Sequence, residues 1–331
     1  MEMTIQLADP SGAEIRELTD DFDVELSGTK MDFEMTVPYA AWDGSIDFDC
    51  RIYVPDTEFG GIVKEIESDT NNQMIYVRGF TWRGQLCKKV ISPPSGADYK
   101  TISGELNSCI SAIIGSEFGT LFQASDADTG KSVTDYRFER YCRMHDGLMD
   151  MLATMGCRLE ITYKQTQAGG YVLVSAVPIV DYSNEVELSS DGRMNFKSLE
   201  NRRGVNHLIC LGQGELRDRV VVHLYAQEDG TVGTTQHYTG VEEFCETYDS
   251  NNSDADQLTE SGTKKLIELM NSQSFTAAAG DDLEDTGIML GDIISGRDYI
   301  TGQQISKPIA KKILRLKSGR ATVEYELEGE G

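Results

Sequence analysis

Asn201 to Tyr225, NRRGVNHLICLGQGELRDRVVVHLY, is the stretch that decides the fold class. It contains two short apolar runs, residues 205–211 and 220–225, and the link between them is polar and contains two glycines. Two apolar, β-branched runs joined through such a link are typical of a β-hairpin. The stretch therefore predicts a pair of strands within a region that is mostly strand.

A second hairpin is predicted at the C-terminus, where the same pattern returns. An apolar run is followed by the turn Lys317–Arg320 and then by the strand Ala321–Leu327. Every other residue of that strand is apolar, which is the pattern of a strand with one buried face. We expect Val323, Tyr325 and Leu327 to point to that face.

Residues 185–331, which contain both hairpins, are predicted to form a β-barrel domain with a helical insertion at about 250–272. The insertion is indicated by the helical spacing of apolar residues between Leu258 and Met270. An acidic loop at 281–285 separates this helix from the last strands. The last third of the chain is thus expected to run strand, helix, strand.

Residues 1–99 are predicted to form another small antiparallel β-barrel, and the two barrels suggest an internal duplication. Six or so short strands, each separated from the next by turn signals, favour such a barrel. Trp82 and Leu86 are expected to begin a closing turn. The proline-rich stretch 92–96 is the best candidate for a linker in the first half of the chain. The expected strands are Met3–Leu7, Val24–Leu26, Phe33–Val37, Arg51–Val54, Gly60–Glu67 and Met74–Gly79, with a turn at Gly28–Lys30.

Residues 100–184 are predicted to form an α+β domain, because the apolar period becomes helical near residue 100. Thr101 or Ser103 is available to cap the first helix, and Gly156 is placed to end the second. A hairpin with strands Arg158–Tyr163 and Tyr171–Val177, joined across Gly169–Gly170, is expected to follow. The apolar helix positions are Ile102, Leu106, Ile110, Ile113 and Ile114 in the first helix and Leu148, Met151, Leu152 and Met155 in the second.

The charge balance is strongly acidic, with 55 Asp and Glu against 30 Lys and Arg and a formal net charge of −25 over 331 residues. Such a surface repels nucleic acid and anionic lipid and keeps a protein soluble. Two explanations stay open: ordinary solubility, or a surface that DNA must pass without binding. No apolar run approaches the roughly 20 residues that span a bilayer, and the N-terminus lacks the features of a secretory signal.

The seven cysteines (50, 87, 109, 142, 157, 210 and 245) are scattered and include no CxxC pair. An odd, dispersed set argues against a disulfide framework and for folding in a reducing cytoplasm. Most lie beside apolar residues, so we expect small core side chains.

Two loops resemble ligand-binding motifs. The stretch Ser125–Ser132, SDADTGKS, ends like a phosphate-binding loop but begins with serine in place of glycine, so nucleotide binding is disfavoured. In the stretch 249–260, Asp249, Asn251, Ser253 and Glu260 fall at calcium-ligand positions, but Asp254 replaces the required glycine. A loop that caps a helix N-terminus explains the same residues better. Whether 249–260 binds a cation is left open.

Cysteine and histidine offer no recognisable active site. Cys142 and His145 form a lone CxxH, which is weak for zinc without a second pair. His207 and His223 lie in strand-like segments and are expected to be structural. We therefore predict no catalytic, cofactor-binding or metal residues, no cofactor, and no enzymatic activity.

Three parts of the chain resemble the tail-hub (baseplate hub) proteins of siphophages and prophages. The first is Val205–Leu216 with Asp218 and Arg219 after it. The second is the start Glu58–Val63 with Val77–Gly79 after it, which is similar to the first barrel of that family. The third, similar to the last barrel, is Leu290–Asp292 with the hairpin Lys312–Leu327. The resemblance rests on the shared order of these short pieces.

The resemblance implies a structural subunit of a virion tail tip or baseplate. Such hubs have two related β-barrels with α+β domains and assemble as a trimeric ring, which adapts the six-fold tail to a three-fold tip. The implied partners are a distal tail protein, a tape-measure protein and a tip or fibre. The implied location is the virion tail after assembly in the host cytoplasm, with DNA passing without specific binding and without membrane insertion. Relatives with a cell-wall hydrolase domain are longer, so any such activity is expected to belong to another protein.

The main alternatives are a carbohydrate- or receptor-binding module and an enzyme. Exposed tryptophans in a cluster would favour sugar binding, but the chain has only Trp42 and Trp82. Both fall in the first β region, where a role in the core is the simpler explanation.

Overall fold

The computed structural model describes residues 4–18, 21–25, 31–184, 187–189, 195–270, 272–279, 287–302, 304–317 and 320–327. Strands predominate and helices are few, which confirms the predicted β-rich α+β class. The predicted turn at Gly28–Lys30 and the predicted acidic loop at 281–285 lie outside the described residues. Among the described residues, no helix has the length and apolarity needed to cross a membrane.

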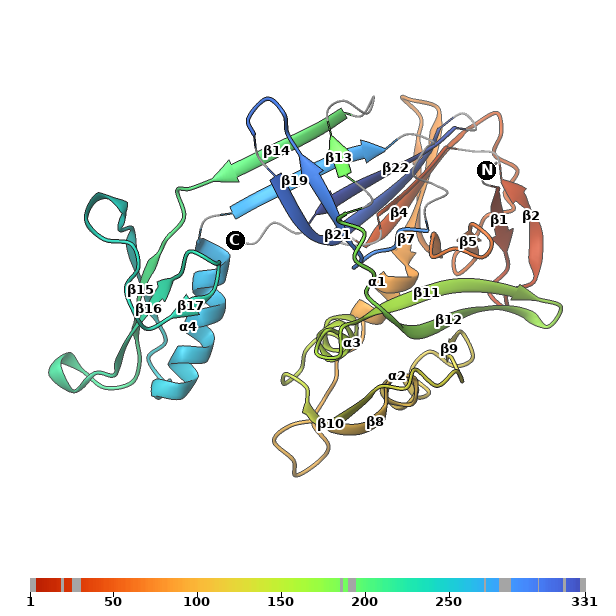
Figure 1. Cartoon of the computed structure of the whole chain (residues 1–331). Helices are drawn as coiled ribbons and strands as arrows, with labels where there is room; N and C mark the ends of the chain where they lie inside the picture. The colour runs from red at the N-terminus through yellow and green to blue at the C-terminus, as the bar shows by residue number, and fades with distance from the viewer. Residues whose placement is uncertain are drawn as a thin grey trace.

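The strands and helices follow one another along the chain as shown in Figure 1. The strands are β1 (Ile5–Ala8), β2 (Glu14–Leu18), β3 (Asp21–Glu25), β4 (Asp32–Pro38), β5 (Arg51–Tyr53), β6 (Gly60–Asp69), β7 (Met74–Thr81), β8 (Thr101–Glu105), β9 (Phe122–Ala124), β10 (Ser132–Arg137), β11 (Cys157–Thr166), β12 (Gly169–Pro178), β13 (Glu187–Ser189), β14 (Asn195–Asn201), β15 (His207–Leu211), β16 (Val221–Ala226), β17 (Val232–Gly233), β18 (Cys245–Asp249), β19 (Ser272–Ala279), β20 (Ile293–Arg297), β21 (Gln304–Lys317) and β22 (Arg320–Leu327). The α-helices are α1 (Trp82–Cys87), α2 (Leu106–Ile114), α3 (Met144–Ala153) and α4 (Ala255–Leu269).

The largest sheet joins strands from both ends of the chain (Figure 1). In the described part of the chain, its order is β14-β19-β22-β21-β3-β4-β7-β6-β5-β1-β2. In addition, β20 pairs with β21, and β13 pairs with β20. The two halves meet where β21 pairs antiparallel with β3, so that Ile313 lies opposite Glu25.

The predicted pair of β-barrels is not confirmed. Among the described strands, β14 and β2 stand at the two ends of the order, and no pairing closes a sheet on itself. A strand edge presents unpaired N–H and C=O groups that must find a partner. The edge of β3 finds that partner in β21, from the other end of the chain, so the two predicted β regions join in one open sheet.

One hydrophobic core lies against this shared sheet and draws on both ends of the chain. It includes Phe33 and Val77 from the first hundred residues together with Leu314 and Tyr325 from the last twenty. The predicted alternation in the last strand is confirmed, because Val323, Tyr325 and Leu327 are buried and the intervening acids are partly exposed.

A second core lies mainly in the α+β region 82–178, below the sheet in Figure 1, and also includes Ala8 and Tyr53 from the first strands. The predicted turn at Trp82 and Leu86 is instead the helix α1, because the Thr81 hydroxyl accepts a hydrogen bond from Gly84 N and caps a helix there. Both Trp82 and Leu86 are fully buried. The predicted hairpin is confirmed as β11 and β12. Its turn consists of residues 167 and 168, and the predicted turn residues Gly169 and Gly170 belong to β12 instead.

The first predicted helix of this region begins later than expected. Residues 101–105 form strand β8, which pairs with β10, so Ile102 is not a helical residue. The cap is Glu105, whose carboxylate accepts a hydrogen bond from Ser108 N at 2.8 Å. The second predicted helix is confirmed as α3, but it ends at Ala153, so Met155 lies in the turn after it, where Gly156 has a left-handed φ of 61°.

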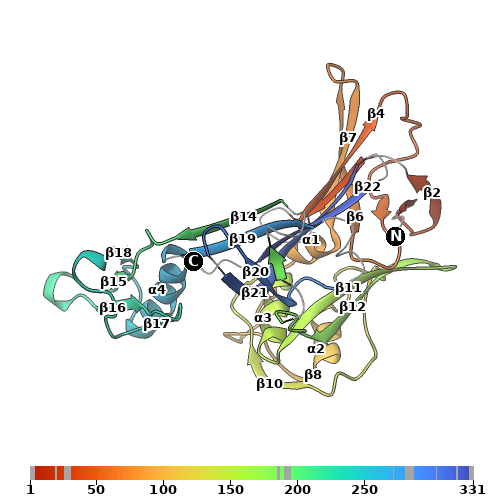
Figure 2. The same ribbon diagram turned by 45° about the horizontal axis from the view of Figure 1, so that its top comes forward.

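Among the described residues, a third core draws only on residues 205–270, which we call the lobe; the remaining described residues are the body. The hairpin predicted from Asn201–Tyr225 is confirmed here, since β15 pairs antiparallel with β16 and His207 lies opposite Tyr225. The strand β18 pairs parallel to β15, and α4 confirms the predicted helix. Figure 2 shows the lobe extending away from the body at the ends of β14 and β19. The predicted domain boundaries at 99 and 184 stay predictions.

Candidate functional site

Buried charged side chains meet where the two cores of the body adjoin. Arg83 on α1 donates to Glu58 at 3.0 Å and to the carbonyl oxygen of Leu159 at 2.9 Å. The Lys312 Nζ on β21 lies 3.9 Å from the other carboxylate oxygen of Glu58. All three side chains are at most 8% exposed. Buried charges persist only when they are paired, so this cluster connects α1 and β11 to the last strands of the sheet.

A second buried ion pair lies beside this cluster. Arg158 on β11 donates to Asp292 at 2.8 Å, and Asp292 also accepts hydrogen bonds from Val180 N and Met289 N. Burial lowers the pKa of Lys312, and the positive charges of Arg83 and Arg158 lower it further against the opposing effect of Glu58. These groups are almost inaccessible to solvent, so the network can position elements but cannot reach a substrate.

The loop Ser125–Ser132 does not have the geometry of a phosphate site. Lys131 donates to the carbonyl oxygen of Met155 at 2.8 Å, and Thr129 donates to Glu105 at 2.7 Å. Ser132 opens the strand β10, whereas a phosphate loop leads into a helix whose N-terminus faces the ligand. The sequence-based rejection of nucleotide binding is consistent with this arrangement.

The stretch 249–260 caps a helix, as the sequence favours. The Asp254 carboxylate accepts hydrogen bonds from Asp256 N and Gln257 N at the start of α4, in a capping box with Gln257. Arg219 donates to both Asp249 and Asn251, at 2.5 and 2.6 Å, so an arginine occupies the place that a cation would take there. Ser253 is hydrogen-bonded to Ser250, and Glu260 lies on α4, 3.7 Å from Lys264.

His207 and His223 in the lobe are held by other side chains, as expected of structural residues. His207 Nδ1 lies 2.7 Å from a Glu243 carboxylate oxygen, and His207 Nε2 lies 2.9 Å from His223 Nδ1. The His207 ring also stacks on Tyr225. The tryptophans pack as expected, because Trp82 is buried and Trp42 lies against the core of the shared sheet.

The structure groups His145 with a cysteine other than Cys142. Cys142 faces Gly147, where a β-carbon would lie 2.9 Å from its sulfur. Cys87, the last residue of α1, instead joins His145 and Asp146 from the first turn of α3. One sulfur, nitrogen or oxygen atom from each of these three residues lies within 4.8 Å of the other two. Cys87 and His145 are far apart in sequence, so no spacing motif could have found the pair.

This cluster mixes a thiol, an imidazole and a carboxylate in a largely buried environment. His145 Nδ1 lies 3.1 Å from Asp146 Oδ1, while Arg143 donates to Asp146 Oδ2 at 2.6 Å. Burial lowers the pKa of His145 despite the neighbouring carboxylate. Burial, reinforced by Asp146, raises the pKa of the Cys87 thiol to about 11. All seven cysteines are free thiols, as the sequence indicates.

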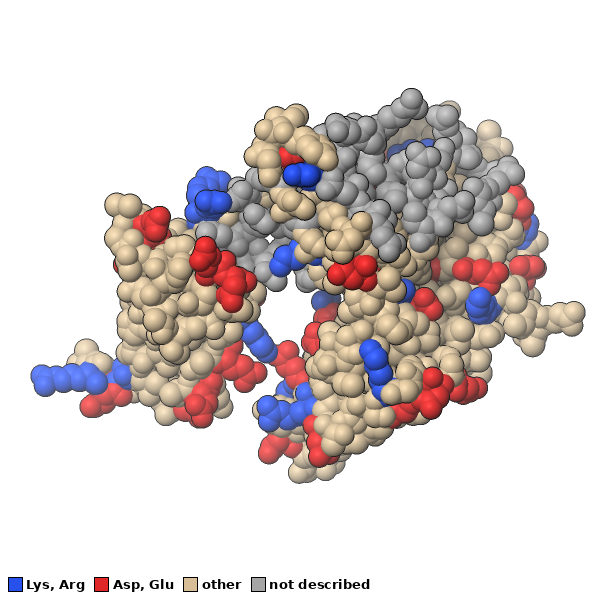
Figure 3. Space-filling model, in the orientation of Figure 1, with Lys and Arg blue, Asp and Glu red and all other residues tan. Residues whose placement is uncertain are grey.

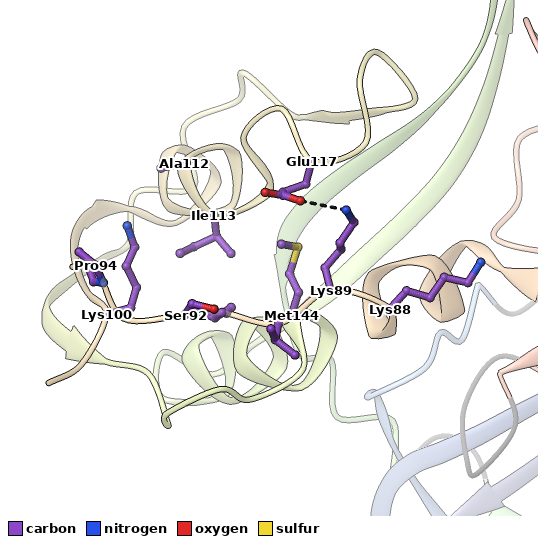
Figure 4. A pocket seen from close by; sticks show the side chains of 11 residues that line it. Lys88, Lys89, Ser92, Pro94, Lys100, Ala112, Ile113, Glu117 and Met144 are labelled. Carbon is purple, nitrogen blue, oxygen red and sulfur yellow. Dashed lines mark hydrogen bonds and ion pairs between the residues drawn. The ribbon is translucent and has the colours of Figure 1, made fainter. Parts of the chain in front are cut away.

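A groove of about 420 Å³ lies beside the same helix ends (Figure 4). Ile113 and Met144 contribute apolar surface, and Lys89 and Glu117 form an ion pair at 3.0 Å across one side. Lys100 stands at the far end, and Lys88 points away. The groove can accept a small apolar group, but its charged rim is already partly neutralised.

Acidic and basic side chains line the facing surfaces of the lobe and the body, on either side of an opening that Figure 3 shows. Lys264 on α4 and Glu139 in the body meet at 2.6 Å. Both side chains are more than half exposed. This pair is a side-chain link between two parts that otherwise have separate cores.

Comparison with known proteins finds relatives only among solved structures. No family model matches the sequence, and no curated protein is significantly similar to it. The 43 kDa tail protein of prophage MuSo2 from Shewanella oneidensis is 13% identical, with a TM-score of 0.59 over 98% of this chain and 98% of that one. The chain has the fold of prophage tail proteins.

A tail protein from Neisseria meningitidis is similar as well, at 12% identity and a TM-score of 0.55 over 99% of this chain and 96% of that one. The prophage tail-protein fold thus extends over nearly the whole length of the chain, the lobe and the α+β region included. The fold-level resemblance predicted from residues 58–79, 205–219 and 290–327 is confirmed.

Proposed function

We propose that the chain is a structural component of a phage or prophage tail. The observation that carries this proposal is the match in fold to two tail proteins, one of them from a prophage, over almost the full length of each chain compared. A match confined to one sheet would be compatible with many functions. This match includes the sheet, the α+β region and the lobe in the same order along the chain, so it favours an assembly role like that of the matched tail proteins.

The specific role that we propose is a hub at the tail tip or baseplate, in which three copies form a ring that adapts the six-fold tail to a three-fold tip. A closed cyclic ring uses heterologous contacts, in which two different patches of each subunit meet. In the described part of the chain, the large sheet ends at β2 on one side and at β14 on the other. Two dissimilar strand edges on one subunit suit contacts of this kind.

The proposed partners are a distal tail protein, a tape-measure protein and a tip or fibre protein. DNA would pass the ring without specific binding, since a chain with a net charge of −25 repels a polyanion. The proposed location is the virion tail after assembly in the host cytoplasm. In this role the protein would act mechanically and not chemically. The buried charged networks around Glu58 and Asp292 suit such a role, because they connect structural elements and are almost inaccessible to solvent.

Light scattering on the purified chain tests the ring. Each chain of 36.6 kDa carries the same large negative charge, so association should be weak at low salt and stronger at high salt, where repulsion is screened. The expected mass is three chains, and a hexameric tail partner should promote it by binding the assembled state. A monomer or a two-fold dimer under every condition would overturn the ring and favour a carbohydrate- or receptor-binding module.

Immunogold labelling of phage particles from the host tests the location. Antibodies against the chain should label the tip of the tail, and the neighbouring genes should encode tail-tube, tape-measure and tip proteins. Particles that lack the chain, or labelling of the capsid alone, would overturn the proposal of a tail component.

A further inference from the structure

We propose that Cys87, His145 and Asp146 bind one zinc ion, which joins the C-terminal end of α1 to the N-terminal end of α3. These residues supply a thiolate, an imidazole and a carboxylate, and the three donor atoms lie within 4.8 Å of one another. Thiolate and imidazole ligands are those that zinc prefers, and a carboxylate is its usual oxygen ligand. Magnesium and calcium take oxygen ligands, so the thiol disfavours them.

The geometry needs only a small adjustment to hold the ion. Zinc bonds of about 2.0–2.3 Å in a tetrahedron place the donor atoms roughly 3.3–3.8 Å apart. The His145 nitrogen and the Asp146 oxygen already lie 3.1 Å apart, so the sulfur must move by about an ångström at most to complete the set. The backbone around the site is already positioned, since Met144 N donates to the carbonyl oxygen of Lys89 at 2.8 Å.

The two nitrogens of the buried His145 ring have different surroundings, because Nδ1 faces Asp146 and Nε2 has no partner among the described residues. Its side chain is 7% exposed, and its Nε2 is buried without a hydrogen-bond partner among the residues that the structure describes. Leaving a buried polar atom without a partner costs about 1–3 kcal/mol in proteins. Zinc on Nδ1, the nitrogen beside Asp146, leaves this deficit at Nε2 in place, so the ion would stabilise the ring only through its bonds to His145, Cys87 and Asp146.

A fourth ligand is available beside the three proposed ones. The Met31 sulfur lies 3.2 Å from the Cys87 sulfur and borders the site. Asp146 is 37% exposed, which gives the ion a route from solvent, and Arg143 holds only Oδ2 and leaves Oδ1 toward His145. Water or the Met31 thioether completes the coordination. The ion would thus hold together α1, which carries Arg83 of the buried network, and α3 of the α+β core.

Cobalt(II) titration of the reduced, full-length protein tests the site, since cobalt reports thiolate ligands by a charge-transfer band in the near ultraviolet. We expect one equivalent to bind with this band and zinc to displace it. Cys87→Ser should remove the band and weaken cobalt binding at least about tenfold, because even lesser changes around metal sites cost that much. Cys142→Ser and Cys245→Ser are the matched controls, one near His145 in sequence and one an exposed thiol, and both should keep the band.

A second measurement does not depend on a variant that folds. Zinc should raise the thermal midpoint of the wild-type chain, and a chelator should reverse the shift, because a ligand that binds the native state stabilises it. No thiolate band in the wild type would overturn the proposal. So would a band that Cys142→Ser or Cys245→Ser abolishes while Cys87→Ser retains it.

Discussion

The body and the lobe of this molecule achieve their cohesion in different ways. In the body, strands from both ends of the chain share a core, and buried ion pairs such as Arg158–Asp292 connect its parts. In the lobe, the described core residues all fall within 205–270, and the chain enters and leaves through the paired strands β14 and β19. The exposed pair Lys264–Glu139 links the two.

This difference in chain topology predicts a difference in cooperativity. The body depends on contacts between residues that are hundreds of positions apart, so damage at one end of the chain should loosen the other. The lobe depends on contacts within one continuous segment and should open as a unit of its own. The two tryptophans, Trp42 and Trp82, both belong to the body, so tryptophan fluorescence follows the body alone, while hydrogen exchange of 205–270 follows the lobe.

The largest expected effect comes from breaking the buried ion pair of the body. Asp292→Ala leaves the buried Arg158 with only the longer contact to Glu160, at 3.5 Å, and removes the acceptor for Val180 N and Met289 N. Removing one member of a buried pair costs about 3–5 kcal/mol. Urea unfolding followed by tryptophan fluorescence should show this loss.

The matched control for Asp292→Ala is Lys164→Ala, which breaks the exposed pair Lys164–Asp56 and should cost at most about 1 kcal/mol. Hydrogen exchange of the lobe should be unchanged in both variants. Equal destabilisation by both, or faster exchange throughout 205–270, would mean that the body and the lobe unfold together.

The next largest effect is expected in the last strand of the shared sheet. Tyr325→Ala removes a buried ring from a core that both ends of the chain build, and should cost on the order of 3 kcal/mol. Glu324→Ala, one residue away on the other face, should stay within about 1 kcal/mol because its ion pair with Arg315 lies near the surface. Similar losses at the two positions in urea unfolding would contradict the register of β22.

The lobe has its own sensitive position at Gly262 on α4. A β-carbon there would lie 2.5 Å from the Cys210 sulfur, because the helix packs closely on β15. Gly262→Ala should destabilise the lobe by about 1–3 kcal/mol through overpacking, although alanine favours helix by about 1 kcal/mol. Hydrogen exchange in 205–270 should accelerate while the tryptophan signal of the body stays as in the wild type.

A double substitution identifies the cause of the Gly262→Ala effect. Cys210→Ala removes the sulfur that the new methyl group would meet, so the double variant should recover part of the loss. The coupling between the two positions should be about 0.5–3 kcal/mol, as for residues in contact. Strictly additive losses would show that the glycine is needed for another reason.

Helix caps allow the two parts to be compared at a similar site in each. Glu105 caps α2 in the body, and Asp254 caps α4 in the lobe, so each alanine substitution should cost about 1 kcal/mol and only in its own part. Desolvation raises the pKa of Glu105, but hydrogen bonds from Ser108, Thr129 and Asn107 outweigh it and hold the pKa at about 2.

A pKa below the ordinary 4.5 means that the contribution of Glu105 is complete above pH 4.5 and is lost as the pH falls toward 2. The difference in stability between the wild type and Glu105→Ala should shrink over that window. Urea unfolding at several pH values measures it, and a difference that grew toward low pH would contradict the assigned cap.

The sequence predicts local structure well where a single segment decides it. The hairpin at 201–225, the helix at 258–270 and the alternation in 321–327 follow from periods and turn signals that neighbouring residues carry. The pairing of β21 with β3 depends on which of several strand edges meet after folding, and no local pattern encodes that choice. For this reason one open sheet was predicted as two barrels.

The same distinction applies to side-chain sites. The cap at Asp254 was predictable because its partners are two and three residues away. The grouping of Cys87 with His145 requires the end of α1 to meet the start of α3, and the lone CxxH of Cys142 and His145, dismissed as weak, gave no sign of it. Glu58, Arg83 and Lys312 likewise show no sequence signal, because charged residues are normally exposed and their burial is visible only in the assembled body.

The smallest expected effect on stability concerns the link between the two parts. Lys264→Ala removes the pair with Glu139, whose side chains are 54% and 62% exposed, so it should change the free energy of unfolding by at most about 1 kcal/mol. Its consequence should be geometric instead, because the lobe is otherwise attached through β14 and β19. Small-angle scattering of Lys264→Ala should show a wider range of lobe positions than the wild type, and 1 M salt should have the same effect on the wild type by screening the pair.

Lys265→Ala is the matched control, since Lys265 pairs with Glu268 within α4. A scattering curve that is unchanged in Lys264→Ala would mean that the strands alone set the position of the lobe.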